Sequence, residues 1–173
     1  MRYLLLLLLW PLAANAQTPI TTFPNDYLGD WYGNLSIYNA NGKAQDLKME
    51  LHLAETDSAG RWQWTLVYEM DTTRDERKYE LVALDAEKGH YVVDEKNSIM
   101  LDSYLYNNVL TSRFSVSNSL LIVNYTFYAD RIEFLILFGP IESKQETGKE
   151  VENVGAIFAY PMQGMQRATL YRQ

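Results

Sequence analysis

The sequence has 173 residues, with 22 Asp and Glu against 15 Lys and Arg and a formal net charge of −7. A chain of this length suits one domain with a single buried core. The negative charge argues against binding to nucleic acid or anionic lipid, because those surfaces repel an acidic chain. The chain contains no cysteine, which excludes disulfides, thiol nucleophiles and a lipid-modified cysteine.

Residues 1–16 have the features of a signal peptide. Arg2 provides a positive start, Leu4 to Leu9 and Trp10 form a short apolar stretch, and Ala14-Asn15-Ala16 places small residues at the cleavage position. The apolar stretch is shorter than the roughly 20 residues that span a bilayer. We therefore expect cleavage after Ala16 and export of a soluble protein, periplasmic or secreted, without a membrane anchor.

Alternation of polar and apolar residues begins after an extended lead-in at residues 17–28, which contains Pro19 and Pro24. We expect a short helical turn near residues 25–28. The first strand follows, with its apolar face at Trp31, Gly33, Leu35 and Ile37. A hairpin turn at residues 39–42 ends in Asn-Gly, a pair that tolerates positive φ.

The next two strands show the clearest inward faces of the chain. One returns through Leu47, Met49, Leu51 and Leu53, with polar residues between them, which is typical of a sheet that is solvated on its outer side. The following strand carries the bulkiest face of the sequence. Its members are large apolar or aromatic side chains at a spacing of two: Trp62, Trp64, Leu66, Tyr68 and Met70.

Short turns separate the remaining strands. A charged loop is expected at residues 71–76, and a long polar, acidic loop at 141–155, which we interpret either as a solvated excursion or as a lid over a barrel mouth. The expected strands are 78–84, 90–94, 99–106, 109–117, 120–128, 131–138, 154–160 and 166–172.

The serial hairpins predict an all-β protein, a single antiparallel up-and-down barrel of about 8–10 strands, with a sandwich as the alternative. Barrel closure removes the unpaired edges that a meander would otherwise expose. The opening Gly29-Asp30-Trp31 resembles that of lipocalin-like (calycin) β-barrels of exported bacterial proteins, and the barrel domain is expected over 29–173. The resemblance implies that Trp31 plugs one barrel end, with Arg172, or else Arg167, lying across it.

Few residues suggest catalysis. The chain has no Gly-x-Ser-x-Gly motif, and its only histidines, His52 and His90, are too few for a metal centre built on several imidazoles. Haem barrels similar to nitrobindins use a late-strand His, and no His follows His90. We therefore expect no metal, no cofactor and no enzymatic activity, with paired carboxylates at the barrel mouth as the remaining catalytic alternative.

The 13 Tyr, 6 Phe and 4 Trp either fill the barrel or line a cavity. Our leading hypothesis is a barrel that binds a small apolar or amphiphilic molecule. The predicted lining is the bulky face, Trp62, Trp64, Leu66, Tyr68 and Met70. The alternative is an accessory module of an exported complex, which meets a protein partner through the 141–155 loop or through outward Tyr104 and Tyr106.

Overall fold

The structure is a computed structural model that describes residues 22–148 and 155–173. The predicted signal peptide at 1–16 therefore lies outside the described residues. Helix is confined here to two single turns, η1 (Asn25–Tyr27) and η2 (Ala86–Lys88). No helix within these ranges is long and apolar enough to cross a membrane.

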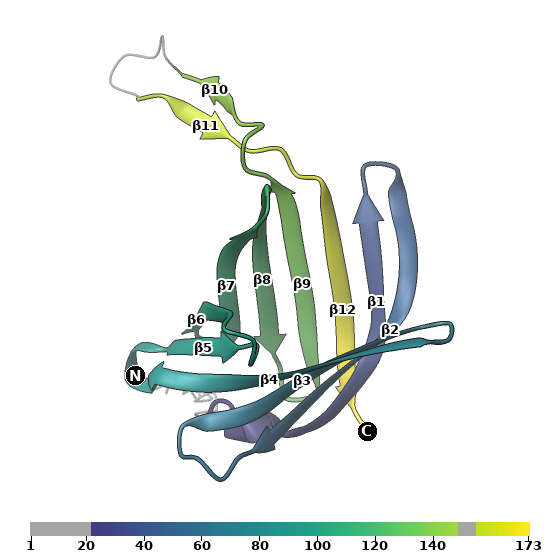
Figure 1. Ribbon diagram of the computed structural model, residues 1–173, viewed down its shortest axis with the longest axis vertical. Coiled ribbons are helices and arrows are strands. Elements are labelled where there is room, and N and C mark those ends of the chain that lie inside the picture. Colours follow the sequence, from purple (N-terminus) through teal and green to yellow (C-terminus); the bar gives the residue numbers. More distant parts are fainter. Residues whose placement is uncertain (1–21, 149–154) are drawn as a thin grey trace, which may run out of the picture.

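Strands of the described chain close into an antiparallel barrel (Figure 1), and this confirms the predicted fold class. Each barrel strand pairs with the barrel strands that precede and follow it, which includes the pairing of β9 with β12. The first strand, β1, pairs with the last, β12, and completes the closure. The barrel strands are β1 (Gly29–Asn39), β2 (Gly42–Glu55), β3 (Arg61–Met70), β4 (Thr73–Asp85), β5 (His90–Asp94), β6 (Met100–Tyr106), β7 (Val109–Val116), β8 (Ser119–Phe127), β9 (Arg131–Pro140) and β12 (Gly164–Arg172).

The segment 154–160 is not a barrel strand, contrary to the prediction. Its strand β11 (Ile157–Ala159) pairs only with β10 (Gln145–Thr147), in a separate two-stranded sheet. Figure 1 shows this hairpin projecting away from the barrel above β9 and β12. The physical reason is that β9 pairs directly with β12 as far as Phe138 opposite Gly164, which leaves no barrel edge for the segment between them.

The predicted charged loop at 71–76 is also wrong, because β4 already begins at Thr73. A tight turn joins β3 to β4, and Asp71 adopts a positive φ of 50° there, as Asp tolerates. The two strands pair from Met70 opposite Thr73 onward. Charged residues remain in a strand here because the hairpin extends beyond the barrel wall, where water solvates them.

The two ends of the barrel differ, and we name them by the pairs that close β1 against β12. The plugged end is the one at Trp31 opposite Arg172, and the open end is the one at Asn39 opposite Gly164. Alternate residues of every strand face inward. The most deeply buried members of this inward set include Trp31, Leu51, Trp64, Leu81, Phe127 and Ile132.

Candidate functional site

The segment before β1 closes the plugged end. Trp31 is fully buried, and its indole Nε1 donates a 2.9 Å hydrogen bond to the Tyr27 carbonyl. The Arg172 guanidinium carbon lies 4.6 Å from the Trp31 ring centroid, and Arg172 Nη2 donates a 3.1 Å bond to the Asp26 carbonyl. Gly29 has a φ of +123°, which side-chain-bearing residues rarely adopt. A cation–π contact and two hydrogen bonds thus fix η1 across this end.

An aromatic cluster fills the space behind the Trp31 indole. The Phe23 and Phe127 ring centroids lie 5.0 Å apart, and those of Tyr27 and Phe127 lie 4.8 Å apart. Trp62 joins the same end from outside the cluster, because its Nε1 donates a 2.9 Å hydrogen bond to Asn25 Oδ1. Within the described part of the lead-in, residues 22–28, Phe23 and Tyr27 therefore pack into the end of the barrel.

The interior contains a cavity of about 260 Å³ toward the open end. This volume corresponds to roughly nine water molecules in the liquid. Side chains of β3–β9 and of the β5–β6 connection line it: Trp64, Leu66, Tyr68, Arg77, Tyr79, Val93, Glu95, Leu101, Ser112, Phe114, Val116, Leu121, Val123, Tyr125, Phe134 and Ile136.

Three aromatic side chains form the floor of this cavity. The Trp64 and Tyr125 rings meet edge to face at 5.0 Å and 90°, and the Tyr125 and Phe134 centroids are 4.9 Å apart. Burial raises the pKa of the Tyr125 phenol well above its ordinary value. The floor is therefore neutral and rigid, and it separates the cavity from the plugged end below.

Polar groups gather at the mouth of the cavity. Arg77 donates from Nε and Nη2 to Asp75 Oδ2, at 2.9 and 2.8 Å, and its guanidinium carbon lies 5.0 Å from the Tyr68 ring centroid. Burial raises the pKa of Tyr68 to about 12. Burial, followed by the charge of Glu95, also raises the pKa of Tyr79. Both phenols therefore stay protonated near neutral pH.

The five predicted lining residues lie at different positions along β3, and only some of them reach the cavity. Trp64, Leu66 and Tyr68 line the cavity, whereas Trp62 and Met70 do not. Trp62 lies level with the plug, where it contacts Asn25. Met70 lies at the tip of the β3–β4 hairpin, where it is 45% exposed and its sulfur contacts Gln45 Nε2. A shared inward face therefore does not bring all five side chains to one site.

Sequence reasoning missed the polar mouth. The expected loop at 71–76 and strand at 78–84 leave Arg77 between them, and no role was predicted for Tyr79 or Glu95. The available signal was the alternation of β4, because Asp75, Arg77 and Tyr79 continue backward, at a spacing of two, the inward face of the strand. Extending the strand through its charged residues would have placed Arg77 on the same side of the strand as Tyr79 and Leu81, at the cavity mouth.

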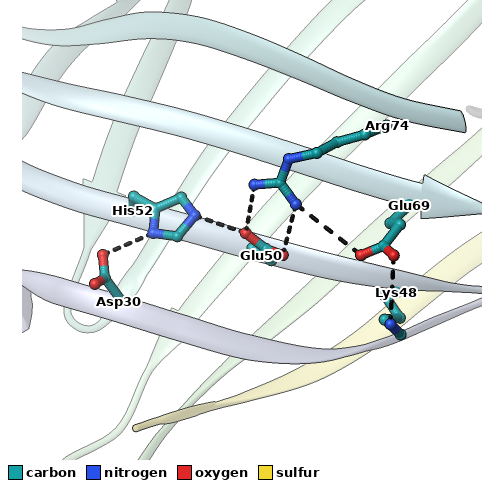
Figure 2. A network of polar contacts seen from close by, with 6 residues as sticks. All are labelled: Asp30, Lys48, Glu50, His52, Glu69 and Arg74. Atoms are coloured by element: carbon teal, nitrogen blue, oxygen red, sulfur yellow. Dashed lines mark hydrogen bonds and ion pairs between the residues drawn. The ribbon is translucent and has the colours of Figure 1, made fainter.

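A polar network covers the outer face of β1–β4 (Figure 2). His52 Nδ1 lies 2.6 Å from Asp30 Oδ1, and Nε2 lies 2.9 Å from Glu50 Oε2. Arg74 donates to both Glu50 oxygens, at 3.0 and 3.1 Å, and these bonds hold the pKa of Glu50 below its ordinary value. Burial would lower the pKa of His52, but its bonds to Asp30 and Glu50 outweigh burial and raise the pKa above 6.5.

The second histidine belongs to a row of parallel rings on the outer face of β5 and β6. His90 stacks on Tyr104 with centroids 4.7 Å apart and planes within 1°, and Tyr104 stacks on Tyr106 at 6.2 Å. His90 Nε2 lies 2.7 Å from Asp102 Oδ1. Tyr104 and Tyr106 are exposed, and in neither case does a histidine enter the cavity lining.

The described part of the 141–155 loop does not cover the cavity. Its strand β10 pairs with β11 in the projecting hairpin, and residues 141–148 and 155 are absent from the cavity lining. Residues 149–154, also part of that predicted loop, lie outside the described residues. The described residues therefore do not form the lid that we considered from the sequence.

The fold of this protein is similar to that of several proteins of known structure. No protein-family model and no curated protein matches the sequence. Among solved structures, an S-type phycobiliprotein lyase, CPES, from Guillardia theta is similar over 86% of this chain and 89% of its own, with a TM-score of 0.57 and 8% identity. Rv2717c from M. tuberculosis is similar over 86% of this chain and 93% of its own, with a TM-score of 0.54 and 11% identity.

A DUF3598-family protein of unknown function from Nostoc punctiforme PCC 73102 has a TM-score of 0.58 at 12% identity, over 86% of this chain. The present chain spans about half the length of that protein, 48% of it. Identities this low establish shared architecture and nothing more specific. The neighbours share an antiparallel ten-stranded barrel, consistent with a lipocalin-like (calycin) fold.

One expectation from the sequence needs correction at this point. We expected no enzymatic activity, because the sequence has no Gly-x-Ser-x-Gly motif, no cysteine and only two histidines. The Guillardia theta protein has the same barrel and is a lyase. The fold therefore gives no basis for excluding catalysis, because function depends on the groups placed in the cavity rather than on the barrel that holds them.

Proposed function

We propose that this protein binds a small apolar or amphiphilic molecule in the cavity at the open end of the barrel. The observation that carries the proposal is the division of the lining into an aromatic and aliphatic floor and a polar mouth. Ligand pockets commonly combine mostly apolar walls with a few polar groups that fix orientation. The volume of about 260 Å³ is near the lower end of the usual range of about 300–1,000 Å³, which favours a compact ligand.

The proposal can be tested by calorimetric titration with 1-octanol, a neutral amphiphile, against wild type and Val123→Trp. Val123 lines the cavity, so the larger indole should occupy the binding space and abolish binding. Trp62→Phe is the matched control, because Trp62 lies outside the cavity and its replacement should leave binding intact. Unchanged binding by a folded Val123→Trp protein would refute binding in this cavity.

A second candidate function, an accessory module with a protein partner, is favoured by one specific observation. Four large exposed apolar side chains lie within six consecutive residues of β11 and the segment that follows it: Ile157, Phe158, Tyr160 and Met162. Exposed apolar groups that gather in this way are typical of interaction surfaces. Pull-down with wild type and with a Phe158→Ser, Met162→Ser variant tests it, and a partner retained equally by both proteins would contradict it.

Export of a soluble protein to the periplasm or the medium is also part of the proposal. It rests on the charge, apolar stretch and small residues of positions 1–16. Fractionation of a bacterial host that expresses the full chain, with N-terminal sequencing, should yield a mature protein that begins at Gln17. An intact N-terminus recovered from the cytoplasm would contradict it.

A further inference from the structure

Charged side chains reach the mouth of the otherwise mostly apolar cavity. Arg77 and Glu95 are the two charged side chains among its lining residues. Arg77 projects inward from the middle of β4, opposite Leu66 on β3, while Glu95 lies in the connection that follows β5. A strand holds a side chain more rigidly than a connection does, so Arg77 is the better-positioned charge for fixing a ligand.

The surroundings of Arg77 orient its guanidinium. The group lies 5.0 Å from the Tyr68 ring centroid, and Tyr79, the next inward residue of β4, lines the same mouth. Cation–π contact favours the charged form and limits rotation of the long side chain. The cation is thus held at the boundary between the apolar cavity and water.

The Arg77 guanidinium already binds one carboxylate, that of Asp75. A single carboxylate oxygen, Asp75 Oδ2, takes the bonds from both Nε and Nη2, at 2.9 and 2.8 Å. Nη1 of Arg77 makes no ion pair with an acidic side chain of the described residues. Guanidinium groups bind carboxylates through two parallel N–H donors. The guanidinium is also hydrogen-bonded to the Tyr79 side chain. A second carboxylate would bind on the Nη1 side, beside that phenol, and Asp75 serves as an internal model of the bound anion.

We propose that Arg77 makes the cavity selective for amphiphiles with a carboxylate head group, which it binds at the mouth while the apolar body lies over the Trp64–Tyr125–Phe134 floor. This inference rests on the proposed function, since it names the class of ligand for the same cavity. Asp75 competes with the ligand for the guanidinium, and Glu95 repels the ligand carboxylate from across the mouth. Arg77 sets the preference, and the two acids limit its strength.

The test compares three ligands of equal chain length, 1-octanol, octanoate and octylammonium, by calorimetry at pH 7.5. Wild type should bind octanoate on the order of tenfold more tightly than octanol, which is the scale of a charge-assisted hydrogen bond at a half-exposed site. Arg77→Met keeps an apolar side chain of similar length and should remove this preference, so that the variant binds octanoate no more tightly than octanol. Arg77→Lys keeps the positive charge but lacks the two parallel N–H donors of a guanidinium, so part of the preference for octanoate over octanol should remain.

Two further variants sharpen the test. Asp75→Asn weakens the competing pairing of the guanidinium, and Glu95→Gln removes the repelling charge, so each should raise the ratio of octanoate to octanol affinity severalfold. Equal affinity of wild type for octanol and octanoate, or tightest binding of octylammonium, would overturn the inference while the proposed function stands. Failure of all three ligands to bind would overturn the proposed function itself.

Discussion

The two ends of the barrel are built from similar residues but differ in what fills them. At the plugged end, η1 and Phe23 bring extra aromatic groups against Trp31 and Phe127, and Arg172 covers the indole. At the open end, none of the described residues forms such a segment, and a cavity of about 260 Å³ remains above the Trp64–Tyr125 pair. The short segment before β1 therefore distinguishes the end that is packed as core from the end that can receive a ligand.

The largest expected effect comes from removing the central group of the plug. Trp31→Ala deletes a fully buried indole together with its hydrogen bond to Tyr27. We expect the free energy of unfolding to fall by about 3–5 kcal/mol, as measured by urea denaturation. Met70→Ala is the control: Met70 is 45% exposed at the open end, so this substitution should lower the free energy of unfolding much less. Equal decreases for the two variants would contradict the structural difference between the ends.

Two substitutions that enlarge a side chain test whether the ends differ in free volume, and we expect the second-largest effect from them. Leu170→Phe enlarges a fully buried side chain near the plug and should destabilise the protein by about 1–3 kcal/mol through overpacking. Val123→Leu enlarges a cavity-lining side chain and should leave the free energy of unfolding unchanged or slightly higher. Thermal and urea unfolding measure both. A strongly destabilised Val123→Leu protein would indicate that the cavity is filled.

A smaller effect is expected from the cation that covers the plug. Arg172→Met keeps part of the apolar contact with Trp31 but removes the cation–π interaction and the bond to the Asp26 carbonyl. The expected loss of unfolding free energy is about 1 kcal/mol. Arg167→Met is the matched control, since Arg167 lies over Tyr38 near the open end. If Arg167→Met lowered the free energy of unfolding more than Arg172→Met, the assignment of Arg172 as the stabilising cation of the plug would be wrong.

The smallest effect concerns the outer face, where the network of Figure 2 runs from Asp30 near the plugged end to Arg74 on the β3–β4 hairpin. The pKa of His52 is raised above 6.5 in the folded protein. Its pairing therefore stabilises the fold fully below about pH 6.5, and the contribution is lost as the pH rises through the folded-state pKa.

His52→Gln should accordingly lower stability at pH 5.5 by at most about 1 kcal/mol and have a smaller effect at pH 9. Urea midpoints of wild type and variant at both pH values measure the difference. Octanol binding should be the same for both proteins, because His52 does not line the cavity. A gap in stability that widens toward alkaline pH would contradict the assignment of a paired imidazolium.

Much of the barrel could be read from the sequence because its strands alternate strictly and its turns are short. The inward faces at Trp31–Ile37 and Leu47–Leu53 follow directly from the two-residue period. Errors occurred where charge and strand coincide, as at the start of β4, and where a short strand pairs outside the barrel, as in β11. At β4 the charged composition was outweighed by pairing with β3 across a tight turn. At β11 the short strand pairs with nearby β10 and not with a barrel strand.

The sequence by itself predicted an all-β meander of serial hairpins and the inward face of most of its strands, because these depend on local periodicity and on short connections. Closure into a barrel and not a sandwich, and the exclusion of β11 from it, were decided by the tertiary structure. Only the tertiary structure decided the height of each side chain along the barrel, which separates Trp62 at the plug from Tyr68 in the cavity. Height depends on strand tilt and on register between neighbours, such as Leu66 opposite Arg77. The same register placed Arg77 at the cavity mouth.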